Sequence, residues 1–114
     1  MNKKYRIKKN KEFQHIFKKG RSFANRQLVI YYMFVPKQTH FRVGISVGKR
    51  IGNAVIRNRI KRYIRESFIN LQSDIKPNVN IIIVARQPTK ELGYKEIKSS
   101  LLHLLRKQKL LRNV

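Results

Sequence analysis

The stretch that decides the fold is Lys49–Arg65, which reads KRIGNAVIRNRIKRYIR. It contains seven Lys and Arg residues and no carboxylate. Asn53 is a natural N-cap, and the apolar spacing after it predicts a helix over 54–71. One side of that helix would carry Ile56, Ile60, Tyr63, Ile64 and Phe68. The other side is cationic and lacks the interleaved Glu of an ordinary surface helix, so we expect its charges to meet an outside partner.

The cationic side of this helix continues into the residues just before it. The candidate binding residues, called the basic ridge below, are Lys49, Arg50, Arg57, Asn58, Arg59, Lys61, Arg62 and Arg65. Such a row of bases is typical of contact with nucleic-acid phosphates. Asn58 adds an amide that can reach a base edge or a 2′-hydroxyl. A merely solvated face is the alternative, and the absence of any acid between Glu12 and Glu66 disfavours it.

Length and charge bound the kind of protein. The 114 residues, 41% of them apolar, suit a single domain over 1–114. The net charge is +23, so nucleic acid is the first candidate partner and an anionic membrane surface the second. There is no cysteine, no secretory signal and no apolar run of about 20 residues that would span a bilayer. We therefore expect a cytoplasmic protein that is not held in a membrane.

Catalytic and metal-binding groups are scarce. The five carboxylates are Glu12, Glu66, Asp74, Glu91 and Glu96, and they do not cluster as general acid–base pairs or Mg²⁺ cages require. The three histidines, His15, His40 and His103, lack metal-ligand spacing. No glycine-rich phosphate loop is present. We expect no catalytic residue, no metal or cofactor bound by the chain itself, and no small-molecule substrate.

The rest of the chain predicts further elements. Helices are expected over 10–19, capped by Asn10, and over 93–107; strands are expected over 27–35, 41–47 and 80–85. Residues 21–26 read as a loop, 1–9 as a basic arm with a mobile tip, and 108–114 as a basic tail that frays. The second strand is expected to run antiparallel to the first. This order indicates an α+β fold, a small sheet with helices against it.

The predicted strand 41–47 has two unlike faces. Phe41, Val43, Ile45 and Val47 face a core, whereas Arg42, Gly44 and Ser46 form a small and basic face. That face predicts a shallow trough suited to an extended polymer. Aromatic side chains beside a basic groove hold single strands, which makes Phe13, Phe17, Tyr31, Arg42 and Ser46 the candidates here. Aromatic residues at such spacings are also common in cores, so that alternative stays open for the three rings.

The run Lys49–Arg62 resembles the protein component of bacterial ribonuclease P, whose motif is a basic pair, then G-x-A-V, then R-N-R followed by more bases. The likeness extends over nearly the whole chain. It includes Arg6–Asn10 with Phe13 and Phe17, Ala24–Gln27, Arg42–Val47 and Ile82–Arg86. Two positions depart from the family: Gly48 stands where many relatives have serine, and Arg50 where lysine is common.

The resemblance implies a fold that composition does not reveal. It is a small α/β sandwich of order αβββαβα, with a central mixed sheet, three helices and a left-handed βαβ crossover, against the usual hand. This order has one more strand before the long helix than the residues alone predict, and a break within the strand over 27–35 is one way to supply it.

The resemblance also implies the partners. The family binds a large catalytic RNA, ribonuclease P RNA, which holds most of the Mg²⁺ and cleaves precursor tRNA to form the mature 5′ end. The protein would be a non-catalytic subunit that binds the single-stranded 5′ leader in a cleft at Phe13, Phe17 and Tyr31. Its R-N-R region would contact the catalytic RNA. The alternative is a general RNA-binding protein, such as a small ribosomal protein or RNA chaperone, which needs neither the trough nor the R-N-R block.

Overall fold

The computed structural model describes residues 1–112. The main elements are α1 (Asn10–Lys19), β1 (Arg21–Ala24), β2 (Leu28–Phe34), β3 (Arg42–Ser46), α2 (Ala54–Leu71), β4 (Val79–Ala85) and α3 (Tyr94–Lys107). Short 3₁₀ turns, η1 (Lys3–Tyr5), η2 (Lys49–Ile51), η3 (Gln72–Asp74) and η4 (Gln87–Glu91), lie between them. The order αβββαβα implied by the family resemblance is confirmed.

The four strands form one mixed sheet in the order β1-β2-β4-β3. β2 pairs antiparallel with both β1 and β4, and β3 pairs parallel with β4. β3 therefore runs antiparallel to β2, as expected, but β4 lies between them. Helix α2 is the crossover that joins the parallel neighbours β3 and β4; the hand of this crossover stays a prediction.

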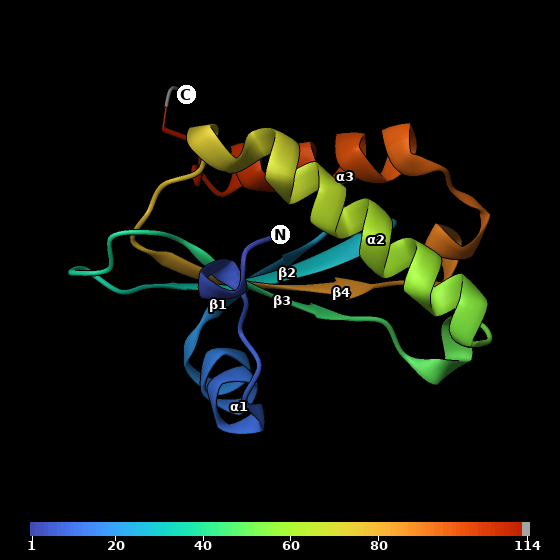
Figure 1. Cartoon of the computed structure of the whole chain (residues 1–114), viewed down its shortest axis with the longest axis horizontal. Helices are drawn as coiled ribbons and strands as arrows, with labels where there is room; N and C mark the ends of the chain where they lie inside the picture. Colours follow the sequence, from blue (N-terminus) through green and yellow to red (C-terminus); the bar gives the residue numbers. More distant parts are fainter. Residues whose placement is uncertain (113–114) are drawn as a thin grey trace.

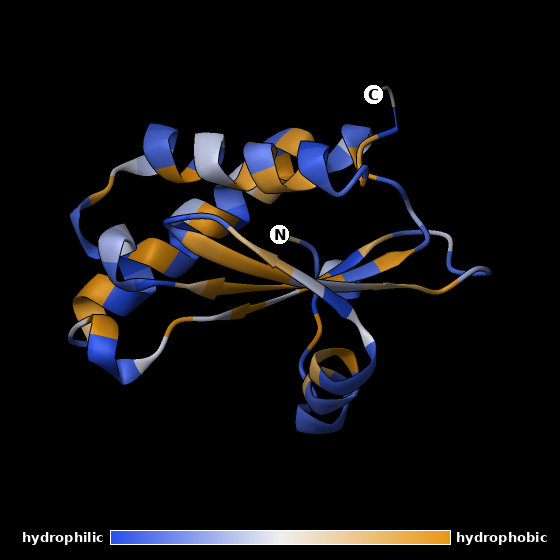
Figure 2. Cartoon of the chain, turned by 180° about the vertical axis from the view of Figure 1, so that it is seen from behind, coloured by the Kyte–Doolittle hydropathy of each residue, from blue (hydrophilic) through white to orange (hydrophobic). Residues whose placement is uncertain are grey.

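Helices cover both faces of the sheet. α2 and α3 lie on one face, and α1 lies alone on the other (Figure 1). Because side chains alternate along a strand, Ile81 and Ile83 enter the α2–α3 core, whereas Ile82 packs with Ile7 and Ile16 under α1. Figure 2 shows that the central strands are mostly hydrophobic, whereas the helices carry both hydrophobic and hydrophilic residues.

Helix α2 forms where the sequence predicts it. The Asn53 side chain accepts a hydrogen bond from the Ile56 amide at 3.0 Å, which caps the first turn. Ile60, Ile64 and Phe68 are completely buried against the sheet and α3. The predicted apolar side is therefore the core side, and the basic ridge faces outward.

Helix α1 ends where the chain meets β2. A Cβ on Gly20 would lie 2.6 Å from the Ile16 carbonyl oxygen and 2.7 Å from that of Tyr32, so only glycine permits this close approach. The start of α1 differs from prediction: Lys9, not Asn10, is the N-cap, and no side chain caps the helix there.

The loop predicted over 21–26 is wrong in its first part. Arg21–Ala24 is strand β1, an edge strand that pairs antiparallel with β2. All four of its residues are exposed, so their sequence carries no alternation of apolar and polar residues. This edge strand, and not a break within 27–35, supplies the extra strand.

The N-terminal arm is anchored at its base, and the C-terminal tail is more ordered than predicted. In the arm, Ile7 is buried and its amide donates to the Val43 carbonyl at 2.9 Å. In the tail, Leu110 and Leu111 are buried and Leu111 bridges to Ile75, because both side chains complete the α2–α3 core. The prediction of fraying is therefore wrong for 108–112; residues 113–114 lie outside the described chain.

Candidate nucleic-acid interface

The three predicted aromatic residues meet on the α1 face of the sheet. The ring centroids of Phe17 and Tyr31 are 4.8 Å apart in an edge-to-face arrangement, and those of Phe13 and Phe17 are 6.2 Å apart. All three side chains are half-buried: they pack against the small core under α1 and still reach the surface. The rings are thus part of a small core and are also partly exposed, and their role in binding stays a prediction.

The sheet register shows what lies beside these rings. Gly44, Ile82 and Tyr31 form one row across β3, β4 and β2, and α1 packs over this row. The next row is Ser46, Val84 and Val29. All three are half-buried, so this row forms a partly open apolar floor next to α1. We call the rings and this row the aromatic face.

Gly44 determines how close α1 lies to the sheet. A Cβ at this position would lie 2.5 Å from Cζ of Phe13, so the ring rests directly on the glycine backbone. The trough predicted along the small residues of β3 is therefore not empty, because Phe13 fills it at Gly44. Only the part at Ser46 stays open.

Arg42 is engaged within the protein. Its guanidinium forms a bidentate ion pair with Glu12 on α1 and donates to the Arg6 carbonyl at 3.2 Å. The hydrogen bond from Arg42 holds the pKa of Glu12 below its ordinary value, against the opposing effect of partial burial. Arg42 thus positions α1 and the arm, and it is less available to a ligand than the sequence suggests.

The basic ridge lies along the outer side of η2 and α2. Lys49, Arg50, Asn58 and Arg62 are exposed; Arg57, Arg59, Lys61 and Arg65 are half-buried. The nearest acid is Glu66, whose carboxylate is 3.9 Å from Arg62, a distance that contributes little at an exposed site. The ridge therefore keeps most of its charge available.

Turn η4 is hydrogen-bonded to the first part of the basic ridge. Gln87 Nε2 donates to the Arg50 carbonyl at 2.9 Å, and Arg59 donates to the Lys90 carbonyl at 3.0 Å. Within residues 1–112, the Nε atoms of Arg57 and Arg59 are buried without a hydrogen-bond partner. Both guanidinium groups are thus partly dehydrated, and Arg59 is also held by the Lys90 carbonyl, which lowers the entropy cost of binding an anion there.

A small cationic hollow joins the aromatic face to the ridge. It has a volume of about 200 Å³ and is lined by Arg6, Lys8, Phe13 and Arg65, among others. Burial, and then the charge of Arg6, lowers the pKa of Arg65. Arg6 and Lys8 were not among the predicted binding residues, because nothing in the sequence shows that the basic arm lies next to Arg65.

Among residues 1–112, no three His, Cys, Asp or Glu side chains come close enough together to hold a metal ion. None of the helices in this part of the chain is long and apolar enough to cross a membrane.

A four-stranded mixed sheet with an aromatic face and a basic ridge defines a small RNA-binding α/β protein. The comparisons with known proteins agree. The family model described as Ribonuclease P matches residues 1–109. The ribonuclease P protein component of Oceanobacillus iheyensis is 63% identical over 113 residues, covering 99% of this chain and 93% of the relative. That of Listeria monocytogenes is 57% identical over 106 residues, covering 93% and 89%.

Solved structures give the same result. The ribonuclease P protein of Staphylococcus aureus is 51% identical and superposes with a TM-score of 0.88, covering 95% of this chain and 98% of that one. The Thermotoga maritima protein is 27% identical with a TM-score of 0.81, covering 90% and 96%. The chain belongs to the family of bacterial ribonuclease P protein components. These findings give no support to the ribosomal-protein or chaperone alternative.

Proposed function

We propose that this chain is the protein subunit of a ribonuclease P that binds both the catalytic RNA and the single-stranded 5′ leader of precursor tRNA. The observation that carries the proposal is the continuity of the two surfaces. Phe13 belongs to the aromatic face and also lines the hollow that contains Arg65 of the basic ridge. A leader strand on the aromatic face would therefore lie next to the bases that hold the catalytic RNA.

The positions of the carboxylates support the roles that we propose for the protein and the RNA. Glu12 pairs with Arg42, Glu66 lies 3.9 Å from Arg62, and Glu96 accepts from the Gly93 amide at 3.0 Å, so three of the five carboxylates have partners within the protein. In our proposal the RNA supplies the Mg²⁺ sites and the chemistry, in the cytoplasm. The protein neutralises phosphates, holds the leader and strengthens binding of the substrate and of Mg²⁺. It contributes no catalytic residue.

Reconstitution tests this function. The protein is mixed with a bacterial ribonuclease P RNA at low Mg²⁺, and removal of the 5′ leader from precursor tRNA is measured. We expect strong stimulation over the RNA alone, with affinity that falls steeply as salt rises, by a log–log slope of about −0.7 per neutralised phosphate on a single strand. Absence of stimulation, while a relative's protein stimulates the same RNA, would contradict the proposal.

Phe17→Ala tests the aromatic face. Because the ring is half-buried beside Tyr31, its loss should weaken holoenzyme binding of precursor tRNA with a leader by about 1–3 kcal/mol. Binding of mature tRNA, which has no leader, should change little. The ratio of the two dissociation constants is the measurement, and thermal unfolding of the variant is the control. Equal loss for both RNAs would argue against leader binding at this face.

A further inference from the structure

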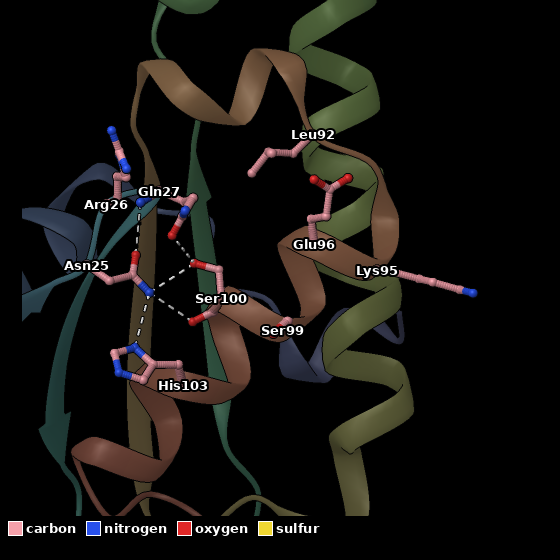
Figure 3. Close-up of a pocket in the computed structure, with 9 residues that line it drawn as sticks. All are labelled: Asn25, Arg26, Gln27, Leu92, Lys95, Glu96, Ser99, Ser100 and His103. Atoms are coloured by element: carbon pink, nitrogen blue, oxygen red, sulfur yellow. Dashed lines mark hydrogen bonds between the residues drawn. The ribbon is translucent and has the colours of Figure 1, made fainter.

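A second cavity lies far from the aromatic face. It has a volume of about 680 Å³ and lies between the turn that joins β1 to β2 and helix α3 (Figure 3). α3 is on the face of the sheet opposite α1 (Figure 1). The cavity and the aromatic face therefore lie on opposite faces of the sheet.

The floor of this cavity is a fixed polar network. Asn25 Nδ2 donates to the Ser100 carbonyl at 3.0 Å and to the Ser100 hydroxyl at 2.9 Å, and it lies 3.4 Å from His103 Nδ1. The Ser100 hydroxyl in turn donates to Gln27 Oε1 at 3.2 Å. Asn25 Oδ1 accepts from the amides of Gln27 and Leu28. The acceptor atoms of the floor are thus used by the protein.

Donors remain around this floor. The imidazole of His103 lies beside this network, with Nδ1 3.4 Å from Asn25 Nδ2. Gln27 Nε2 and the Ser99 hydroxyl have no protein partner within residues 1–112. The one acid in the lining, Glu96, already accepts from the Gly93 amide through Oε1. A lining with surplus donors suits an anion rich in acceptors, such as a phosphate with its sugar.

The basic side chains are spread along the surface, which suits an RNA strand and not a single small anion. Arg26 and Lys95 lie at different margins of the cavity and extend away from its floor (Figure 3). A second hollow of about 340 Å³ shares Ser99 and His103 with the first and adds Arg106 and Lys107. The two hollows make one groove along α3, with bases spaced over its length.

We propose that this groove, from Arg26 and Lys95 to Lys107, is a second RNA-contact surface that takes the sugar–phosphate backbone of a strand of the ribonuclease P RNA. The choice of that RNA as occupant rests on the proposed function. The groove contacts backbone atoms, because its free groups are donors suited to phosphate and 2′-hydroxyl oxygens. It would give the protein two points of attachment, on opposite faces of the sheet.

The first test compares two double variants that remove equal charge. Arg26→Ala with Lys95→Ala removes two bases at the groove, and Lys37→Ala with Lys98→Ala removes two bases outside its lining. We expect the groove variant to bind ribonuclease P RNA roughly tenfold more weakly, with a log–log salt slope smaller by about 1.4 to 1.8. The control should lose less than about threefold. Equal loss in both would overturn the proposal.

The second test uses the absence of cysteine from the chain. Ser99→Cys then offers a single thiol at the groove, to which an iron chelate that generates hydroxyl radicals is attached. In the holoenzyme we expect cleavage of one segment of ribonuclease P RNA, which is lost when Arg26 and Lys95 are both replaced by alanine. Val55→Cys, 75% exposed beside the basic ridge, is the positive control.

The two probes separate the two proposals. Cleavage from Val55→Cys without cleavage from Ser99→Cys would overturn the groove proposal and leave the proposed function standing. Cleavage from neither probe, in a protein that also fails to stimulate the RNA, would contradict both. Binding of a mononucleotide at the groove without any cleavage of the RNA would also overturn the groove proposal.

Discussion

At the scale of residues, Gly44 shows how the absence of one side chain positions another. Its α-carbon supports the Phe13 ring, and a Cβ would lie 2.5 Å from Cζ of that ring. Gly44→Val should therefore push α1 from the sheet and lower the free energy of unfolding by about 1–3 kcal/mol. Denaturant unfolding measures this, and binding of leader-containing substrate should weaken with it.

Gly48 provides a control for a side chain added at a glycine. A Cβ there would meet nothing within 4 Å, so Gly48→Ala should stay within about 0.5 kcal/mol of the parent protein. If Gly44→Val were equally harmless, α1 would not rest on β3 as described.

The pair of Glu12 and Arg42 gives a prediction about pH. Arg42 lowers the pKa of Glu12 in the folded protein, so the pair stabilises the fold above the unfolded pKa of about 4.3. That stabilisation is lost as the pH falls through the lowered folded pKa. Glu12→Gln should cost about 1 kcal/mol at pH 7, because the two side chains are only 27% and 30% exposed, and progressively less as the pH falls below about 4. Urea unfolding across this range is the measurement, and a pH-independent difference would contradict the assignment.

The contacts of Arg42 within the protein could not be predicted from the sequence. Arg42 was predicted as an RNA contact from its place on a small polar strand face, yet two groups of the protein engage it. The missing information was tertiary: alternation shows which face Arg42 occupies, but not that α1 brings Glu12 to the same face. One signal was present in retrospect. Glu12 is the only carboxylate before Glu66, and an isolated acid in so basic a segment indicates a specific partner.

At the scale of elements, the predictable ones are those with a buried stripe. α2 spans the predicted residues because Ile60, Ile64 and Phe68 recur at helical spacing and all reach the core. β4 was predicted to within one residue because its apolar run is buried on both faces. β1 was missed because an exposed edge strand is defined only by its pairing with β2. The basic ridge could be predicted for the same reason as α2. Once the apolar side of the helix is placed against the core, the basic side must face outward.

The end of the chain gives a prediction at this scale. Leu110 is completely buried, its amide donates to the Leu105 carbonyl, and its carbonyl accepts from the Lys76 amide. Leu110→Ala should therefore lower the free energy of unfolding by about 2–5 kcal/mol. Val55→Ala, at a residue that is 75% exposed, should change it by less than about 0.5 kcal/mol. Equal effects, measured by denaturant unfolding, would mean that residues after α3 contribute nothing to the core.

At the scale of the whole molecule, charge opposes folding. The net charge is +23, and the ion pairs within residues 1–112 are those of Arg42 with Glu12 and Arg62 with Glu66. Such self-repulsion destabilises the compact state. The fold also brings basic side chains together at three places: the basic ridge, the hollow at Arg65 and the groove along α3. The repulsion among the basic side chains at each place falls when an anion binds there, so folding and anion binding should be coupled.

This coupling predicts that multivalent anions raise the melting temperature more than simple salt does. Chloride screens charge over a distance of about 10 Å at 0.1 M, whereas inorganic phosphate or a short RNA also binds the folded state. A ligand at 100 times its dissociation constant adds about 2.7 kcal/mol to the free energy of unfolding, provided it does not bind the unfolded chain. Thermal unfolding in phosphate and in sodium chloride of matched ionic strength measures the difference. Identical curves would mean that general screening alone relieves the repulsion, and that the clustered cations do not act as binding sites in the free protein.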